Sequence, residues 1–126
     1  MVTWLENLGL EFSFDDDNSG YSQDEYFWKA SSLYAAAEEQ GCKPYRLPLK
    51  FIDMSDERWK KSGRIVDVAH HYMRIRNADT SIPIILSPVG GILDGYHRIV
   101  RALVDGEKYI MALRLLDMPE PDEGAE

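Results

Sequence analysis

The chain has very little cysteine and no long apolar run. Of its 126 residues only Cys42 is a cysteine, so no intramolecular disulfide can form. No stretch approaches the roughly 20 apolar residues that a membrane-spanning helix needs. The first residues lack the basic start and the apolar core of a secretory signal. We therefore expect a cytoplasmic protein with no membrane association, built around one hydrophobic core.

Acidic residues predominate, but they are distributed unevenly. The formal net charge is −8. Residues 1–42 hold one lysine and nine acidic residues, residues 43–117 hold thirteen basic and nine acidic residues, and residues 118–126 hold four acidic residues. The central part can attract a phosphate-bearing ligand, whereas the whole molecule would repel duplex DNA. We predict an acidic N-terminal helical extension, a core and a disordered acidic tail with these same bounds.

Two segments of the extension have local patterns of their own. The acidic run at 15–20 predicts a solvated loop, and a divalent metal loop is the less favoured alternative because the spacing of a calcium hand is missing. Ser22 and Glu25 have the spacing of a capping box, and they open a predicted helix that extends to about Gln40 with one apolar face. We expect this helix to pack on the core or to face a protein partner.

The first half of the core predicts one strand and two helices. Residues 44–52 predict a strand at a sheet edge, because prolines accompany the alternating apolar residues. A short helix is expected over 56–63 and a longer one over 64–77. His70 and His71 diverge by about 100° on that helix, so we interpret them as surface histidines or as histidines satisfied within the protein, and predict no metal site.

The second half of the core predicts a strand pair, a helix and a closing strand. Residues 82–86 and 92–93 form the pair around a Gly-Gly turn, and a helix follows from near Tyr96 to a stop at Gly106. Residues 109–116 predict the last strand. Together with the edge strand, these elements predict an α/β (α+β) fold, with a small mixed sheet of about four strands and helices packed on it.

A polar cluster stands where the second strand of the pair meets the helix, with the sequence Asp94-Gly95-Tyr96-His97-Arg98. The first turn of a helix leaves backbone N–H groups unpaired, which favours an anion. Gly95 permits close backbone approach, and Arg98 has a forked donor set suited to phosphate. We predict that Gly95, Tyr96, His97 and Arg98 bind a phosphate or a nucleotide. The alternative is a structural loop, in which Asp94 caps the helix and Arg98 pairs with a nearby acid.

At these residues the chain resembles the ParB/sulfiredoxin superfamily, whose members carry Gly-x-His-Arg or Gly-x-Arg-Arg at this junction. The Asp-Gly-x-His-Arg form is most similar to stand-alone ParB-like proteins, among them free serine kinases. The resemblance covers roughly residues 44–117 and includes the Pro48-Leu49 pair of the opening strand. It implies a ParB/sulfiredoxin-like fold and a junction that handles nucleotide phosphates, with ATP or ADP and Mg²⁺ as ligands.

The resemblance also implies an enzymatic hypothesis, nucleotide-dependent phosphoryl transfer. Arg98 and the N–H groups after Gly95 would hold phosphates. His97 would contact a phosphate or shuttle a proton, and Asp94 would bind Mg²⁺ or orient the acceptor. The related kinases need a carboxylate near the opening strand as a base, for which this chain offers the candidates Asp53, Asp56 and Glu57.

Other activities of the superfamily do not fit. Sulfiredoxin chemistry needs a cysteine where this chain has Tyr96, and a phenol cannot replace a thiolate. Partitioning ParB proteins carry a helix-turn-helix region after this core, and no recognisable two-metal carboxylate set indicates a nuclease. The competing hypothesis is a non-enzymatic interaction or regulatory protein, whose acidic extension at 1–42 docks on a protein partner.

Overall fold

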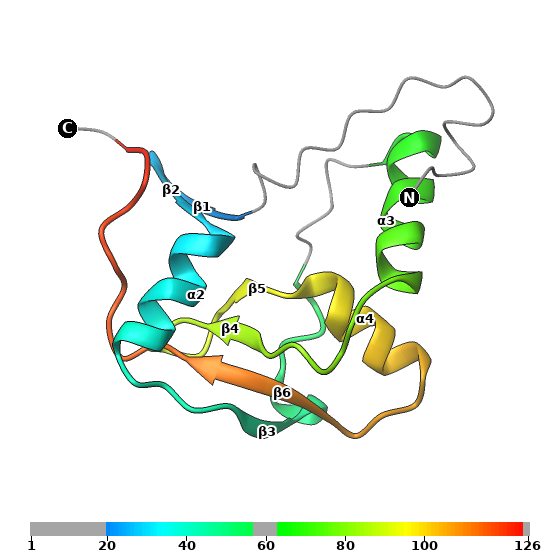
Figure 1. The fold of residues 1–126 in the computed structure, drawn as a ribbon. Coiled ribbons are helices and arrows are strands. Elements are labelled where there is room, and N and C mark those ends of the chain that lie inside the picture. Colours follow the sequence, from blue (N-terminus) through cyan, green and yellow to red (C-terminus); the bar gives the residue numbers. More distant parts are fainter. Residues whose placement is uncertain (1–19, 57–62, 125–126) are drawn as a thin grey trace.

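The computed structural model describes residues 20–56 and 63–124. Figure 1 shows the elements, which follow one another as β1 (Gly20–Gln23), β2 (Tyr26–Lys29), α2 (Ala30–Glu39), β3 (Tyr45–Pro48), the 3-10 turn η2 (Leu49–Phe51), α3 (Ile65–Arg76), β4 (Ile84–Leu86), β5 (Ile92–Asp94), α4 (Tyr96–Val104) and β6 (Tyr109–Arg114). The predicted acidic loop up to residue 19, most of the helix predicted over 56–63 and the candidate base Glu57 lie outside the described residues. No helix in the described ranges is long and apolar enough to cross a membrane.

Four strands form the main sheet, in the order β3-β6-β4-β5. The central pair, β4 and β6, is parallel, and the two outer pairs are antiparallel. A parallel pair needs a crossover connection, and α4 lies in that connection between β5 and β6. β3 lies at an edge, as its prolines predicted. The structure thus confirms an α+β protein with a small mixed sheet of four strands.

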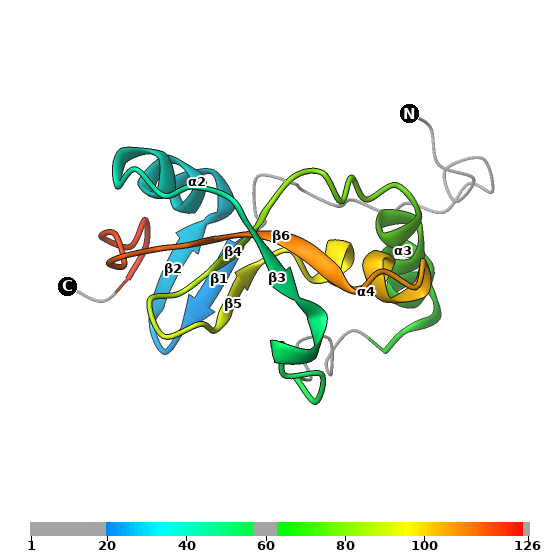
Figure 2. The same cartoon turned by 90° about the horizontal axis from the view of Figure 1, so that it is seen from below.

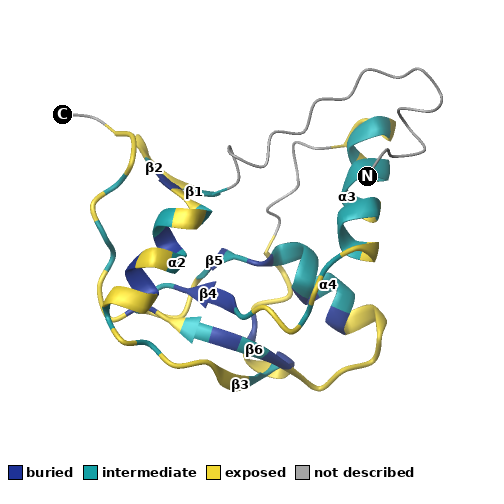
Figure 3. Ribbon diagram, in the orientation of Figure 1, coloured by how far each residue is buried: buried dark blue, intermediate teal, exposed yellow. Residues whose placement is uncertain are grey.

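Alternation along the strands divides the core between the two faces of this sheet. Ile84 and Leu86 point to one face and Ile85 to the other, because successive strand residues point in opposite directions. The side chains on the face of Ile84 and Leu86 form the first hydrophobic cluster. This cluster also contains residues of η2 and its C-cap, α4 and β6, namely Leu49, Ile52, Ile99, Ala102, Ile110 and Ala112. The second cluster, on the face of Ile85, adds residues of β2, α2, β5 and the chain just after β6, namely Trp28, Leu33, Ala36, Ala37, Leu93 and Leu115. Figure 3 shows these buried positions along the strands and the inner sides of α2 and α4.

The helices lie on opposite sides of the sheet. α2 and the β1–β2 hairpin lie toward one side, and α3 and α4 lie together toward the other (Figures 1 and 2). The helical spacing of Ile65, Val68 and Tyr72 correctly predicted α3, yet these side chains are 91%, 57% and 60% exposed. None of the residues of α3 is buried. This helix therefore contributes polar groups to the neighbourhood of α4 and adds little to the core.

The helix predicted from Ser22 to Gln40 is wrong in its first half. Residues 20–29 form the antiparallel hairpin β1–β2, and the helix begins only at Ala30. Asp24 supplies the left-handed turn conformation, with φ +56°, which aspartate tolerates better than most residues. Tyr21 pairs with Trp28 across the hairpin, with ring centroids 6.0 Å apart. Aromatic side chains favour such strand pairs, and this preference overrides the capping-box pattern.

The acidic tail, predicted to be disordered, instead pairs with β2 through residue 123. The Phe27 amide donates to the Glu123 carbonyl at 2.8 Å, and the indole N–H of Trp28 donates to the Pro119 carbonyl at 2.8 Å. Asp122 accepts hydrogen bonds from the Lys29 amide and the Ser32 hydroxyl, each at 2.8 Å. A carboxylate close to the start of α2 is favoured by the helix dipole. The tail is therefore held by the start of α2.

The described part of the N-terminal extension belongs to the same packed unit as the sheet. Leu33 and Ala37 of α2 are 0% and 1% exposed and share a cluster with Ile85 and Leu115. Removing residues 1–42 would uncover that face of the sheet, because burial of its apolar side chains depends on α2 and β2. Such a deletion would test core stability as well as partner binding.

A sharp corner at Gly95 sets the direction of α4. Gly95 has φ +118°, a conformation that other residues rarely adopt. A Cβ atom built there would lie 2.3 Å from Cγ2 and 2.7 Å from Cβ of Ile84. The missing side chain therefore allows the backbone to pass directly over a fully buried strand residue.

We expect Gly95→Ala to lower the free energy of unfolding by about 2 to 4 kcal/mol, the sum of backbone strain and overpacking. Gly106→Ala is the matched control, since Gly106 also has positive φ (+75°) but a Cβ atom added there would meet nothing within 4 Å. Its cost should be about 1 kcal/mol, from strain alone. Urea unfolding of both variants measures the difference, and equal losses would contradict the close packing on Ile84.

Candidate functional site

The predicted motif surrounds the N-terminal turn of α4. Asp94 ends β5, Gly95 is the N-cap, and Tyr96, His97 and Arg98 form the first turn. That turn contains no acidic residue, and the first backbone bond of the helix runs from the Ile99 amide to the Gly95 carbonyl. Helix geometry gives the earlier N–H groups no intrahelical acceptor, so this end of α4 favours negative charge.

Arg98 is directed into the protein. Its Nη1 donates to the carbonyls of Ile82 at 3.1 Å and Pro83 at 2.7 Å, and its Nη2 donates to Asp94 Oδ2 at 2.8 Å. The side chains of Arg98 and Asp94 are only 13% and 19% exposed. The sequence also allowed a structural loop, in which Arg98 pairs with a nearby acid and Asp94 caps the helix. The structure shows the ion pair, and its acid is Asp94, which does not cap the helix. Both residues hold the corner in place, and we assign neither a direct contact with a ligand.

Tyr34 brings α2 to the same corner. Its hydroxyl donates to the Pro83 carbonyl at 2.6 Å, so this oxygen accepts from both Tyr34 and Arg98. The guanidinium carbon of Arg98 lies 5.8 Å from the centre of the Tyr34 ring. Burial raises the pKa of Tyr34 above its ordinary value, and the nearby positive charge of Arg98 partly offsets this effect. The phenol therefore stays neutral and acts as a hydrogen-bond donor.

His97 faces α3. Its Nε2 lies 2.9 Å from Nδ1 of His71, and the two rings are stacked with centroids 5.2 Å apart. A contact of this length between ring nitrogens needs one donor and one acceptor, so at least one imidazole is neutral. α3 and α4 thus bring together two histidines that are 26 positions apart in the sequence.

The surroundings of His97 oppose positive charge. Burial lowers the pKa of His97 from 6.5 to about 3, and Arg74, His71, His70 and Arg98 act in the same direction. Burial also lowers the pKa of His71, with a contribution from Arg74. Both imidazoles are therefore neutral near pH 7. Near neutral pH, a neutral His97 can donate or accept a hydrogen bond but is a poor base.

Tyr96 links the motif to the segment that follows β3 and η2. Its hydroxyl donates a hydrogen bond to Asp56 Oδ2. Of the two candidate bases that the structure describes, Asp56 contacts the motif, whereas Asp53 accepts hydrogen bonds from the amide and hydroxyl of Ser55 at 3.0 and 2.6 Å. The structure thus places one expected carboxylate beside Tyr96, 40 positions away in sequence.

Sequence analysis missed the contribution of α3. The sequence excludes a shared metal ion for His70 and His71, because adjacent histidines on a helix diverge, but nothing in it shows which helix faces which. The spacing of His70, His71 and Arg74 does indicate a polar, basic side of α3. Only the packing of α3 on α4 shows that this side meets His97.

The described residues offer no protein-built metal centre. Within 20–56 and 63–124, no group of three or more histidine, cysteine, aspartate or glutamate side chains is arranged to hold a metal ion. The carboxylate of Asp94 is engaged with Arg98. A nucleotide at this corner would therefore bring Mg²⁺ on its own phosphates, which is how this ion commonly enters nucleotide sites.

Comparisons with known proteins identify no relative. No protein-family model matches the chain, and searches of curated proteins and of solved structures found no match. The similarity to the ParB/sulfiredoxin superfamily therefore depends on the motif and its flanking elements alone.

We expect Arg98→Gln to lower the free energy of unfolding by about 2 to 4 kcal/mol, because it leaves the poorly exposed Asp94 carboxylate without its cation. Arg101→Gln is the matched control. Arg101 also forms a 2.8 Å ion pair four residues away, with Asp105, but those side chains are 34% and 42% exposed. Its loss should be at most about 0.5 kcal/mol. Chemical denaturation separates the two, and a small effect of Arg98→Gln would contradict the anchoring role.

The depressed pKa of His97 predicts a pH-dependent stability. The unfolded chain binds a proton at this residue below about pH 6.5, whereas the folded protein does so only near pH 3. Stability should therefore fall as the pH decreases from about 6.5 toward 3. His97→Gln should flatten this part of the curve relative to wild type in urea unfolding between pH 7 and 4.5. Identical slopes for the two proteins would show that His97 is not buried in a neutral state.

Proposed function

We propose that this protein binds a phosphate-bearing small molecule, ATP or ADP with Mg²⁺, at the N-terminal turn of α4. The observation that carries the proposal is a helix N-terminus with a cationic side chain nearby. Arg74 of α3 is close enough to disfavour protonation of His97, and the first turn of α4 contains no acidic residue. Backbone N–H groups and cationic side chains together are the usual means of binding phosphate oxygens.

The motif residues take different roles in this proposal. The backbone after Gly95 and the imidazole of His97 contact the phosphate, and Arg74 supplies the cationic side chain. Arg98 acts as a positioning residue, since its Nη1 and one N–H of Nη2 already donate within the protein. This division keeps the phosphate site predicted from the sequence but transfers the charged contact from α4 to α3.

Phosphoryl transfer is the reaction that would use such a site. Because the pKa of His97 is about 3, the imidazole is a weak proton acceptor in the ligand-free protein. Asp56 is the better candidate for the base, since its carboxylate contacts Tyr96 next to the turn. Tyr96 would orient this carboxylate through its hydroxyl. The resemblance to free serine kinases supports a small hydroxylated acceptor.

Calorimetric titration with ATP and ADP in the presence of Mg²⁺ tests the binding site. Arg74→Gln and His97→Gln should each weaken binding by about tenfold or more, the loss expected for one hydrogen bond to a charged group. Arg76→Gln is the control, since it removes an exposed cation from the same helix. Binding should also raise the pKa of His97, which nuclear magnetic resonance can follow, because the phosphate charge offsets the neighbouring cations.

Two results would refute the proposal. One is that neither nucleotide binds the wild-type protein. The other is that Arg74→Gln and Arg76→Gln bind equally well, since the charge of Arg74 would then have no specific role.

A further inference from the structure

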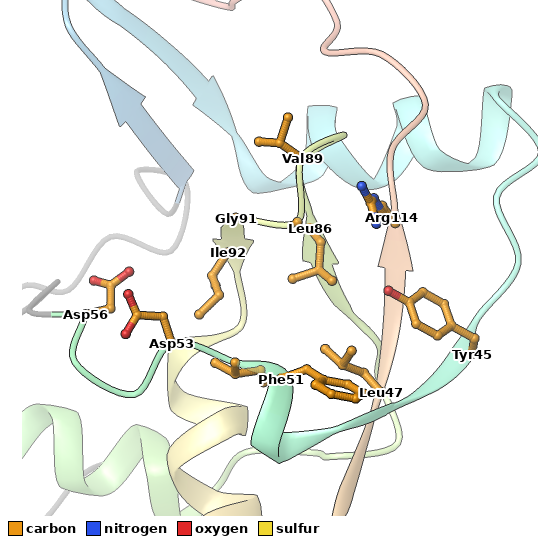
Figure 4. A pocket seen from close by; sticks show the side chains of 12 residues that line it. Tyr45, Leu47, Phe51, Asp53, Asp56, Leu86, Val89, Gly91, Ile92 and Arg114 are labelled. Carbon is orange, nitrogen blue, oxygen red and sulfur yellow. The ribbon is translucent and has the colours of Figure 1, made fainter.

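A pocket of about 550 Å³ lies on the same face of the sheet as α4. Its floor is apolar and includes Leu47, Leu86 and Ile92, which also belong to or pack against the first hydrophobic cluster. η2 and the residues after it form one wall, and the turn between β4 and β5 forms another (Figure 4). Its size and its mixture of an apolar floor with a few polar groups are typical of small-molecule sites.

One end of the pocket is acidic. Asp53 and Asp56 lie side by side there (Figure 4). Asp53 Oδ1 accepts hydrogen bonds from both the amide and the hydroxyl of Ser55, which lower the pKa of this carboxyl below its ordinary value. Asp56 Oδ2 is held by the Tyr96 hydroxyl. Each carboxylate is thus fixed through one oxygen, and no other described residue forms a hydrogen bond to the second oxygen.

The other end of the pocket is basic and polar. Arg114 and Tyr45 lie there, across the floor from the two carboxylates (Figure 4). Arg114 donates through Nε to the Pro88 carbonyl at 2.9 Å, and its Nη2 donates to the same oxygen. These bonds fix the guanidinium at the rim. Its Nη1 has no hydrogen-bond acceptor within the described residues. Opposite charges therefore lie at the two ends of one apolar floor.

We propose that this pocket binds an elongated small molecule with an amine at one end, an acidic group at the other and an apolar chain between them. The amine would lie against Asp53 and Asp56, the acidic group against Arg114 and Tyr45, and the chain over Leu86 and Ile92. A ligand of one charge would leave one end of the pocket unsatisfied, which disfavours it relative to a ligand with both charges. This pocket adjoins the proposed phosphate site and shares Asp56 with it, since Tyr96 of the first turn of α4 donates to that carboxylate.

The charge pattern also distinguishes this pocket from a second phosphate site. A nucleotide phosphate placed on Arg114 would extend its other parts toward two carboxylates, with no cationic group of its own to pair with them. The zwitterionic ligand satisfies both ends, and its methylene chain replaces water over side chains that already belong to the core. The pocket therefore favours a ligand that carries both charges.

Three ligands of equal chain length test this proposal on the full chain: ε-aminocaproate with both charges, hexylamine with only the amine, and hexanoate with only the acid. Binding is followed through the backbone amide signals of Gly90 and Gly91, which line the pocket. We expect ε-aminocaproate to bind at least about tenfold more tightly than either of the others, because it forms one more hydrogen-bonded charge pair with the pocket. No binding of any of them up to about 10 mM, or equal binding of all three, would overturn the proposal.

Two matched pairs of variants locate the charges. Asp53→Asn should weaken ε-aminocaproate binding about tenfold and leave hexanoate unaffected, while Arg114→Gln should weaken ε-aminocaproate and leave hexylamine unaffected. Asp79→Asn is the control for the first, since Asp79 makes the same 3.0 and 2.6 Å hydrogen bonds to Ser81 but lies outside the pocket. Arg101→Gln is the control for the second, since Arg101 also donates to a backbone carbonyl, that of Arg76. Equal effects of a variant and its control would overturn the assignment of that end, and the ligand series on wild type remains decisive if a variant fails to fold.

Discussion

The guanidinium of Arg98 holds the corner on which both the fold and the candidate site depend. It donates to Asp94 at the end of β5 and to the two carbonyls that precede β4, and Tyr34 of α2 donates to one of those carbonyls. One cation thus joins a strand end, a loop and helices from both faces of the sheet. Because Arg98 and Asp94 are mostly buried, each depends on the other for its charge to be tolerated there.

Because Arg98 and Asp94 pair with each other, their charges stabilise the fold and are not available to a ligand. Arg98 is paired with Asp94, and the low pKa of His97 arises first from burial and then from the positive charge of Arg74. The neutral pair of His71 and His97 follows from the same arrangement. The charge that can attract a phosphate therefore comes from α3, a helix that contributes no buried residue to the core.

The two proposed sites lie on either side of Tyr96. Its position in the first turn of α4 belongs to the phosphate site, and its hydroxyl holds Asp56 at the acidic end of the pocket. A phenol has a long reach and can donate a strong hydrogen bond to a carboxylate. Tyr96 thus accounts for the contact between the two proposed sites.

The sequence was most informative where local pattern and final contacts agree. The short apolar runs at β4 and β5, the Gly-Gly turn between them and the helix stop at Gly106 were all predicted, because strand alternation and glycine turns operate over a few residues. The prediction failed at residues 22–29, where a capping-box pattern and aromatic strand pairing compete. The strand outcome is also supported by a contact from the other end of the chain, where the backbone of Glu123 pairs with Phe27.

The sequence by itself determined the α+β class, the hairpin of β4 and β5 and the position of the motif at the start of α4. Only the tertiary structure decided what the motif does with its charges. A guanidinium binds a carboxylate or a phosphate with the same forked geometry, so the residues around Arg98 could not show which it binds. The answer depended on the distance between Arg98 and Asp94 and on the face that α3 turns toward His97, and long-range packing sets both.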